Sequence, residues 1–233
     1  MPRFGFAFGV IALSGCGLIS SNVTSYDLDL PAKSFSVDTN GWQVSQASAD
    51  AVLAKSCAMT PTVCSVAVTS ACPTNNCTGE CDAADHTCNL GLEIAVHQTI
   101  DLLSEKPELK SIDGATSLLQ VTVTSVTYEV TGNTLDIATP ELAVYIAPMA
   151  VMDPHDAGAQ QIGTIAIVPA STIEPSTEMK WVDGGQDVLS ETLASFKNPF
   201  NVIVGGTLTL HSGYAVPMGK LDANVHIKAT ASL

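Results

Sequence analysis

Apolar and polar residues alternate along much of the chain from Leu90 onward. The clearest example is residues 221–232, in which the odd positions are Leu, Ala, Val, Ile, Ala and Ala and the even positions are Asp, Asn, His, Lys, Thr and Ser. A period of two is typical of a β-strand with one face buried and the other in water. The same pattern predicts further strands at residues 92–100, 119–130, 135–137, 142–147, 162–168 and 201–210.

One of these runs changes phase along its length. Val121 and Val123 lie on one face of an ideal strand, whereas Val126 and Tyr128 lie on the other. One extra residue in the strand, a β-bulge, brings both pairs to the same face. We therefore expect a bulge near residues 124–125.

Turn and helix signals separate the strands. Residues 131–134, Thr-Gly-Asn-Thr, are typical of a β-hairpin turn and predict that the two flanking runs are joined there. Apolar residues recur at helical spacing over 186–196, before Pro199 ends the pattern, and residues 45–55 also favour a helix. Helix is therefore expected in two short segments.

Together these elements predict an all-β fold. The expected architecture is one antiparallel β-sandwich or open barrel of about seven to nine strands, with one or two short helices. Alternation along single strands does not distinguish a sandwich from a barrel. The sequence has no internal repeat and no long linker, so residues 26–233 are expected to form a single β-rich domain. A cysteine-rich insertion is expected in it at about residues 57–88.

Composition and charge narrow the choice of partner. Hydrophobic residues make up 46% of the chain and charged residues 14%, which is typical of a folded domain and not of a disordered one. The formal net charge is −14 at pH 7, and the acidic residues are spread singly from Asp27 to Asp222. Such a surface keeps a protein soluble and repels phosphate, so nucleic acid is not expected as a partner.

The N-terminal residues have the organisation of a secretory signal. Arg3 is followed by the ten-residue apolar run 4–13 and then by Ser14-Gly15-Cys16. That run is too short to span the hydrocarbon core of a bilayer, which needs about 20 helical residues. Small residues before Cys16 give a peptidase access to the peptide bond that precedes the cysteine.

This segment resembles the signal peptide and lipobox of bacterial lipoproteins, and the resemblance covers residues 1–16 only. It implies that residues 1–15 are removed and that Cys16 carries acyl chains such as palmitate, which hold the protein on a membrane. Residues 16–25 would then be a lipidated N-terminus and a tether. Gly17 stands where an aspartate would resemble an inner-membrane retention signal, so the resemblance implies a place in the cell envelope at the outer membrane.

The remaining six cysteines fall within one 32-residue window. An even number of cysteines in an exported protein predicts three disulfide bonds, although fifteen pairings are formally open. Pro, Gly, Asn and Asp between them favour turns, so cross-links are expected to order this segment as a loop that projects from the main fold. The predicted disulfide cysteines are Cys57, Cys64, Cys72, Cys77, Cys81 and Cys88.

Metal binding is the competing interpretation of the cysteines. Cys72, Cys77, Cys81 and Cys88, together with His86, offer enough ligands for a tetrahedral ion. Their spacing lacks the paired C-x2-C pattern typical of structural zinc. Disulfides are therefore the preferred interpretation.

Few residues elsewhere suggest chemistry. The sequence has no nucleophile elbow, HExxH helix, Walker loop or dinucleotide fingerprint. His97 and His226 fall on the polar faces of predicted strands and are expected at the surface. Asp153, His155 and Asp156 place a histidine between two carboxylates on a predicted loop and are weak candidates for a divalent ion, although Asp-Pro and Ala-Gly pairs are also ordinary in turns. No catalytic residue, metal or cofactor is assigned.

These observations favour a non-enzymatic envelope module that binds another protein or helps to organise the cell surface. Its partners would be the membrane, through the acyl chains, and a protein. The alternatives are a carrier of a lipid or other apolar ligand and a hydrolase of unfamiliar type, which would need Asp, His and Ser to converge in a pocket. We hypothesise that residues 57–88 carry the binding surface on a scaffold of strands; the competing hypothesis is that they cover a sheet edge.

Overall fold

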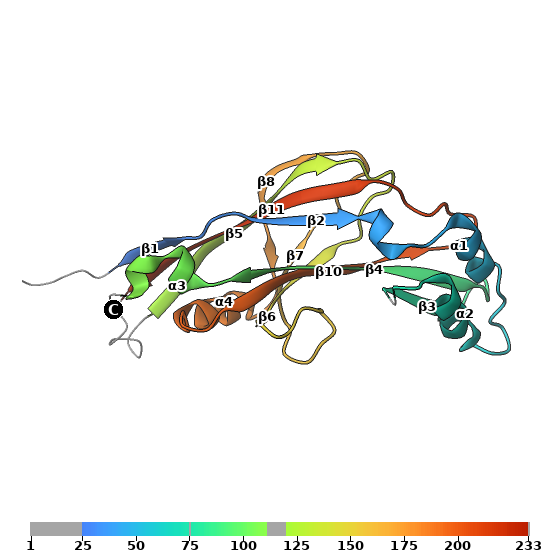
Figure 1. Cartoon of the computed structure of the whole chain (residues 1–233), viewed down its shortest axis with the longest axis horizontal. Helices are drawn as coiled ribbons and strands as arrows, with labels where there is room; N and C mark the ends of the chain where they lie inside the picture. The colour runs from blue at the N-terminus through green and yellow to red at the C-terminus, as the bar shows by residue number, and fades with distance from the viewer. Residues whose placement is uncertain (1–24, 75, 111–119, 233) are drawn as a thin grey trace, which may run out of the picture.

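The computed structural model describes residues 25–74, 76–110 and 120–232. The expected signal peptide (1–15), the expected lipidation site Cys16 and the expected tether up to residue 24 lie outside the described residues. Within them the chain forms two antiparallel β-sheets and several short helices (Figure 1). The predicted all-β class is confirmed, and the two packed sheets make the fold a β-sandwich.

The first sheet is built around the C-terminal strand. Its strands are β1 (Tyr26–Asp29), β2 (Lys33–Asp38), β5 (Gln120–Asn133), β8 (Glu174–Glu178) and β11 (Lys220–Ser232). One side of β11 pairs with β1 and then with β2, and its other side pairs with β5, which in turn pairs with β8. β11 was predicted from its alternation.

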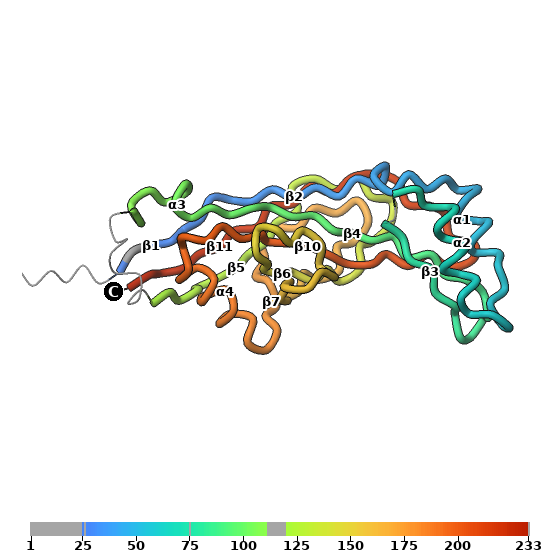
Figure 2. The backbone as a smooth tube through the Cα atoms, turned by 60° about the horizontal axis from the view of Figure 1, so that its bottom comes forward, coloured from blue at the N-terminus to red at the C-terminus, as the bar shows by residue number. Residues whose placement is uncertain are grey.

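The second sheet contains six strands in the order β3-β4-β10-β6-β7-β9. They are β3 (Cys77–Cys81), β4 (Cys88–Ile100), β6 (Leu142–Pro148), β7 (Gln160–Ile165), β9 (Lys180–Trp181) and β10 (Phe200–Leu210). Figure 1 shows the two sheets as layers of an elongated body, and Figure 2 shows that the long strands run along its length. The predicted strands at 92–100, 142–147, 162–168 and 201–210 correspond to β4, β6, β7 and β10.

The core lies between the sheets and consists of the apolar half of each alternating strand. Leu90 and Leu92 of β4 and Val225 and Ile227 of β11 are all buried. Residues of the opposite phase, such as Glu93 and His226, are partly exposed on the outer faces. Burial of alternate side chains is what the period of two requires.

The predicted bulge in β5 is confirmed. Ser125 pairs with Lys228 and Val123 pairs with Ala229, so Thr124 is the extra residue. This insertion lets both Val123 and Val126 face the core, where both are buried.

Helices cover the sheets at a few places. α1 (Gln46–Leu53) falls within the predicted segment 45–55, and α4 (Gly185–Ala194) overlaps the predicted segment 186–196. Ser45 caps α1 by accepting a hydrogen bond from the backbone N–H of Ser48. α4 begins directly against β7, because a Cβ on Gly185 would lie 2.1 Å from the backbone oxygen of Ile162. The 3-10 helix η1 (Thr39–Trp42) and the helices α2 (Val63–Ala71) and α3 (Leu102–Glu105) were not predicted.

Two predictions for the segment after β5 are wrong. Residues 131–134 are not a hairpin turn, because β5 continues to Asn133 and the next strand, β6, belongs to the other sheet. Residues 135–137 are not a strand. The side chain of Asn133 accounts for both differences. Its oxygen accepts a hydrogen bond from the N–H of Leu135, and its amide donates to the carbonyls of Pro169 and Thr172. Such local side-chain bonds compete with a strand ladder and redirect the chain.

Different elements form the two ends of the molecule. β1 and the end of β11 lie at one end, and α1, α2 and β3 lie at the other (Figures 1 and 2). The cysteine-rich segment therefore lies at the end remote from the first described residues.

Candidate functional site

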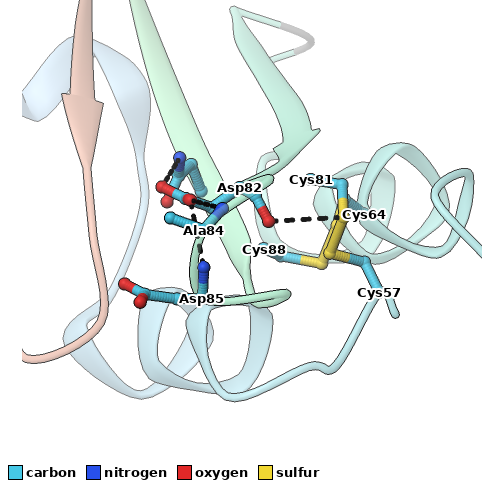
Figure 3. Close-up of a disulfide and its surroundings, with 8 residues drawn as sticks. Cys57, Cys64, Cys81, Asp82, Ala84, Asp85 and Cys88 are labelled. Atoms are coloured by element: carbon cyan, nitrogen blue, oxygen red, sulfur yellow. Dashed lines mark hydrogen bonds between the residues drawn. A yellow bond between two sulfur atoms is a disulfide. The ribbon is translucent and has the colours of Figure 1, made fainter.

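Three disulfides order the remote end of the molecule. Cys57 is bonded to Cys81, Cys64 to Cys88 and Cys72 to Cys77. All six predicted cysteines are therefore oxidised. The first two bonds join the segment before α2 to the end of β3 and α2 itself to the start of β4 (Figure 3). The third joins the end of α2 to the start of β3.

The sequence suggested that the cysteine-rich segment is a projecting loop, and this prediction is wrong. It supplies the edge strand β3 and the helix α2, which packs on it, so it belongs to the second sheet. A Cβ on Gly79 would lie 2.4 Å from the backbone oxygen of Cys64, so only glycine allows α2 to approach β3 this closely. Val68 of α2 is buried in this contact and extends the core.

A groove of about 1140 Å³ lies beside this end. It crosses the outer face of β4 and β10 and is bordered by β3, by β2 with η1, and by the loop between β6 and β7. Trp42 closes one wall, and its indole N–H donates a hydrogen bond to the backbone oxygen of Glu93 at 2.7 Å. The groove is thus formed by elements that are far apart in the sequence.

Glu93 is the carboxylate of the groove whose orientation is fixed by the most neighbours. The hydroxyl of Thr207 on β10 lies 3.1 and 3.0 Å from its two carboxylate oxygens, and the hydroxyl of Thr78 on β3 lies 3.3 Å from one of them. Nε2 of His155 lies 3.5 Å from Glu93 Oε2. The Glu93 side chain is 17% exposed, so neighbours on three sides hold this carboxylate while part of it stays open to the groove.

A buried amide holds the β6–β7 loop over the groove. The side chain of Asn201 is fully buried and donates hydrogen bonds to the carbonyl oxygens of Met149 at 3.1 Å and Val151 at 2.7 Å. Its own oxygen accepts a hydrogen bond from the Thr99 hydroxyl at 2.7 Å. Further along the loop, Pro154 lies where a side chain on Gly205 would be, because a Cβ there would come within 2.8 Å of the proline ring.

The charged side chains that line the groove are acidic. Its lining includes five carboxylates and one imidazole, and none of the described residues that line it is Lys or Arg. The charged and titratable residues of the lining are Asp38, Glu80, Glu93, Asp153, His155 and Asp156. Carboxylates gathered in a concave surface without counter-charges create a negative potential that attracts cations.

The weak candidates for an ion site, Asp153, His155 and Asp156, all line this groove. They are not brought together as a ligand set. Within the described part of the chain, the ligand atoms of three such groups come within 4.8 Å of one another only at Cys57, Cys64 and Cys88. These cysteines are in disulfides, so they offer no thiolate to a metal.

A second polar cluster lies in the turn between β3 and β4. The N–H groups of Ala84 and Asp85 and the side-chain amide of Asn89 donate to the Asp82 carboxylate at 2.8, 3.3 and 3.2 Å, and they hold its pKa below the ordinary value for aspartate (Figure 3). His211 approaches the same carboxylate at 3.9 Å and contributes in the same direction. These contacts stabilise the turn.

Sequence reasoning identified part of this site and missed the rest. It singled out the loop that carries His155, and it predicted the strand that contains Glu93. It gave no role to Glu93, Thr207 or Asn201, because their importance comes from contacts between segments about 50 to 114 positions apart. A charged residue between two apolar residues of a strand was the available signal for Glu93.

Comparisons with known proteins identify no family for this chain. No model of a protein family, no curated protein and no solved structure matches the chain. In the described residues, no helix has both the length and the apolar character needed to cross a membrane.

Proposed function

We propose that the protein is a lipid-anchored lipoprotein of the cell envelope that acts as a non-enzymatic binding module. In this proposal the groove around Glu93 receives a positively charged segment, with a Lys or Arg side chain at its centre, from a partner protein. The observation that carries the proposal is the positioned carboxylate of Glu93 in a groove whose described lining has no Lys or Arg.

The geometry of Glu93 suits recognition of a cation. Hydroxyl donors on both neighbouring strands restrict the carboxylate to one orientation, so little conformational entropy is lost when a ligand binds. Because the side chain is largely shielded from water, an ammonium or guanidinium that enters would form a stronger ion pair than at an open surface. The remaining acidic residues of the lining would add longer-range attraction.

The lining does not favour the apolar carrier. Threonine, asparagine and acidic residues supply much of the groove, and the space between the two sheets is filled by the buried side chains of the core. A carrier would need an apolar cavity for its ligand. This groove therefore supports the binding module better than the carrier.

A photo-crosslinking experiment in the native envelope tests this proposal. A photoreactive amino acid is placed at Ala95, which is exposed and lines the groove, and as a control at Ser176, which is exposed on the other sheet. We expect a specific adduct from position 95, with the label attached to a Lys- or Arg-rich segment of one partner, and a loss of this adduct in Glu93→Gln. An adduct that survives Glu93→Gln, or that forms equally from position 176, would overturn the assignment of the groove.

A further inference from the structure

The outer edge of β3 presents unpaired backbone groups. At the two ends of the β3–β4 ladder, the N–H of Glu93 donates to the oxygen of Asn76 and the N–H of Asp82 donates to the oxygen of Thr87, each at 2.9 Å. Antiparallel hydrogen-bonded pairs alternate along a strand, so Thr78 and Glu80 point their backbone groups toward β4. The N–H and C=O groups of Cys77, Gly79 and Cys81 therefore point away from the sheet.

These groups have no protein partner among the residues that the structure describes. Two other edge strands carry features that discourage pairing: β8 contains Pro175 and two glutamates, and β9 is only two residues long. β3 has no proline, and its end residues are bonded to Cys72 and Cys57. This edge is therefore both open and rigid.

A narrow groove runs beside the edge. It has a volume of about 330 Å³ and lies between β3 and one side of α2, where Ser65, Val68 and Thr69 face it. The hydroxyls of Ser65 and Thr69 donate to the carbonyl oxygens of Thr62 and Val66 within the same helix turn. The α2 wall of the groove thus has small side chains whose hydroxyl protons are already donated within the helix, so these hydroxyls do not compete as donors for the carbonyl oxygens of an incoming chain.

From this arrangement we infer that an extended segment of a partner protein adds to the second sheet as a new strand beside β3. Its backbone pairs with Cys77, Gly79 and Cys81, which is β-strand addition. Alternate side chains of the added strand enter the groove beside α2, and the others lie on the outer face next to Thr78 and Glu80. The inference rests on the proposed function as a protein-binding module and specifies how the partner is held.

Charge determines the chemistry of the occupant. Glu80 lies on the same outer face as the acidic groove, so the side chain opposite it is basic. A second copy of this chain would be a poor occupant. Antiparallel pairing of two β3 strands would bring two Glu80 side chains close together on one face, between chains that each carry a net charge of −14. An extended Lys- or Arg-containing segment fits the edge better than a second copy.

Selection from a displayed library of random heptapeptides tests the inference on the whole protein. The selected peptides are synthesised in two forms, N-methylated on the alternate amides that face β3 or on the other amides. We expect the first form to bind at least tenfold more weakly and the second to bind normally, with slowed hydrogen exchange at the Gly79 amide. Thr69→Trp, which fills the groove, should abolish binding, whereas Ser70→Trp on the other side of α2 should not.

The outcomes separate this inference from the proposed function. Peptides that respond to Glu93→Gln but not to Thr69→Trp or N-methylation would overturn strand addition and leave the acidic groove as the binding site. Peptides that respond to Thr69→Trp and N-methylation but not to Glu93→Gln would support strand addition and refute the role of Glu93. A library that yields no binder, or a Gly79 amide that becomes protected by raising the protein concentration alone, would overturn the inference.

Discussion

Replacement of Asn201 by leucine tests how the groove is built. Asn201 is fully buried, and its side chain makes three hydrogen bonds, two of them to backbone carbonyls of the β6–β7 loop. Leucine has the same branched arrangement of side-chain heavy atoms but cannot make any of the three. Each bond contributes a net free energy of about 1 kcal/mol, so Asn201→Leu should lower the free energy of unfolding by about 3 kcal/mol.

Three measurements check this expectation. Urea denaturation should show a midpoint lowered by roughly 1 to 3 M, since the slope for a small protein is about 1 to 3 kcal/mol per M. Hydrogen exchange should show faster exchange of amides in residues 149–159, because the loop loses the amide that holds it. The adduct from position 95 should also weaken, since the loop carries His155 over Glu93.

Thr99→Val is the matched control. It removes only the hydroxyl that donates to the Asn201 oxygen, and Thr99 is exposed, so the free energy of unfolding should fall by about 1 kcal/mol or less. Loop exchange should be unchanged in this variant. Asn201 does not hold the loop if the free energy of unfolding of Asn201→Leu lies within about 0.5 kcal/mol of the wild-type value. The same conclusion follows if the amides of its loop exchange at the wild-type rate.

Three further predictions concern other parts of the molecule. Gly79→Ala should destabilise the protein by about 2 kcal/mol because its Cβ would contact Cys64, whereas Gly132→Ala, whose nearest contact is 3.6 Å, should have little effect; equal denaturation midpoints would contradict this. Because the pKa of Asp82 is lower in the folded state, its contribution to stability is present above its unfolded pKa and is lost as pH falls through the folded value. Asp82→Asn should therefore flatten the fall in stability below about pH 4, and an unchanged acid profile would argue against it. Cys16→Ser should abolish lipid attachment, which detergent-phase partitioning measures; partitioning like that of the wild type would refute the lipobox assignment.

The long strands were predictable because local sequence alone encodes a half-buried strand. β4 and β11 have 13 residues each and alternate clearly, and even the Thr124 bulge was visible as a phase change. Short strands at sheet edges, such as β1 and β9, have too few residues for a period to be recognised. Which sheet a strand joins depends on distant partners, and this is why residues 131–134 were misread as a hairpin.

The groove was less predictable for the same physical reason. His155 attracted attention because a histidine between acidic residues is a local pattern. Glu93 becomes special only when β3 and β10 bring Thr78 and Thr207 to it, and Asn201 only when its amide meets the β6–β7 loop. The cysteine pairing is similar, since the even number of cysteines predicted oxidation but only the packing of α2 on β3 selects the pairs.

The separation of the two ends has a consequence for where encounters take place. β11 spans about 40 Å at roughly 3.3 Å for each of its 13 residues, and it runs along the length of the body from the β1 end. If a lipid on Cys16, as proposed, holds the body with its long axis upright, the acidic groove and the β3 edge lie tens of ångströms from the bilayer, beyond the Debye length of about 8 Å at physiological salt. The field of anionic headgroups is screened at that height, so a basic segment of the partner would reach the remote end without first being drawn down to the lipid surface.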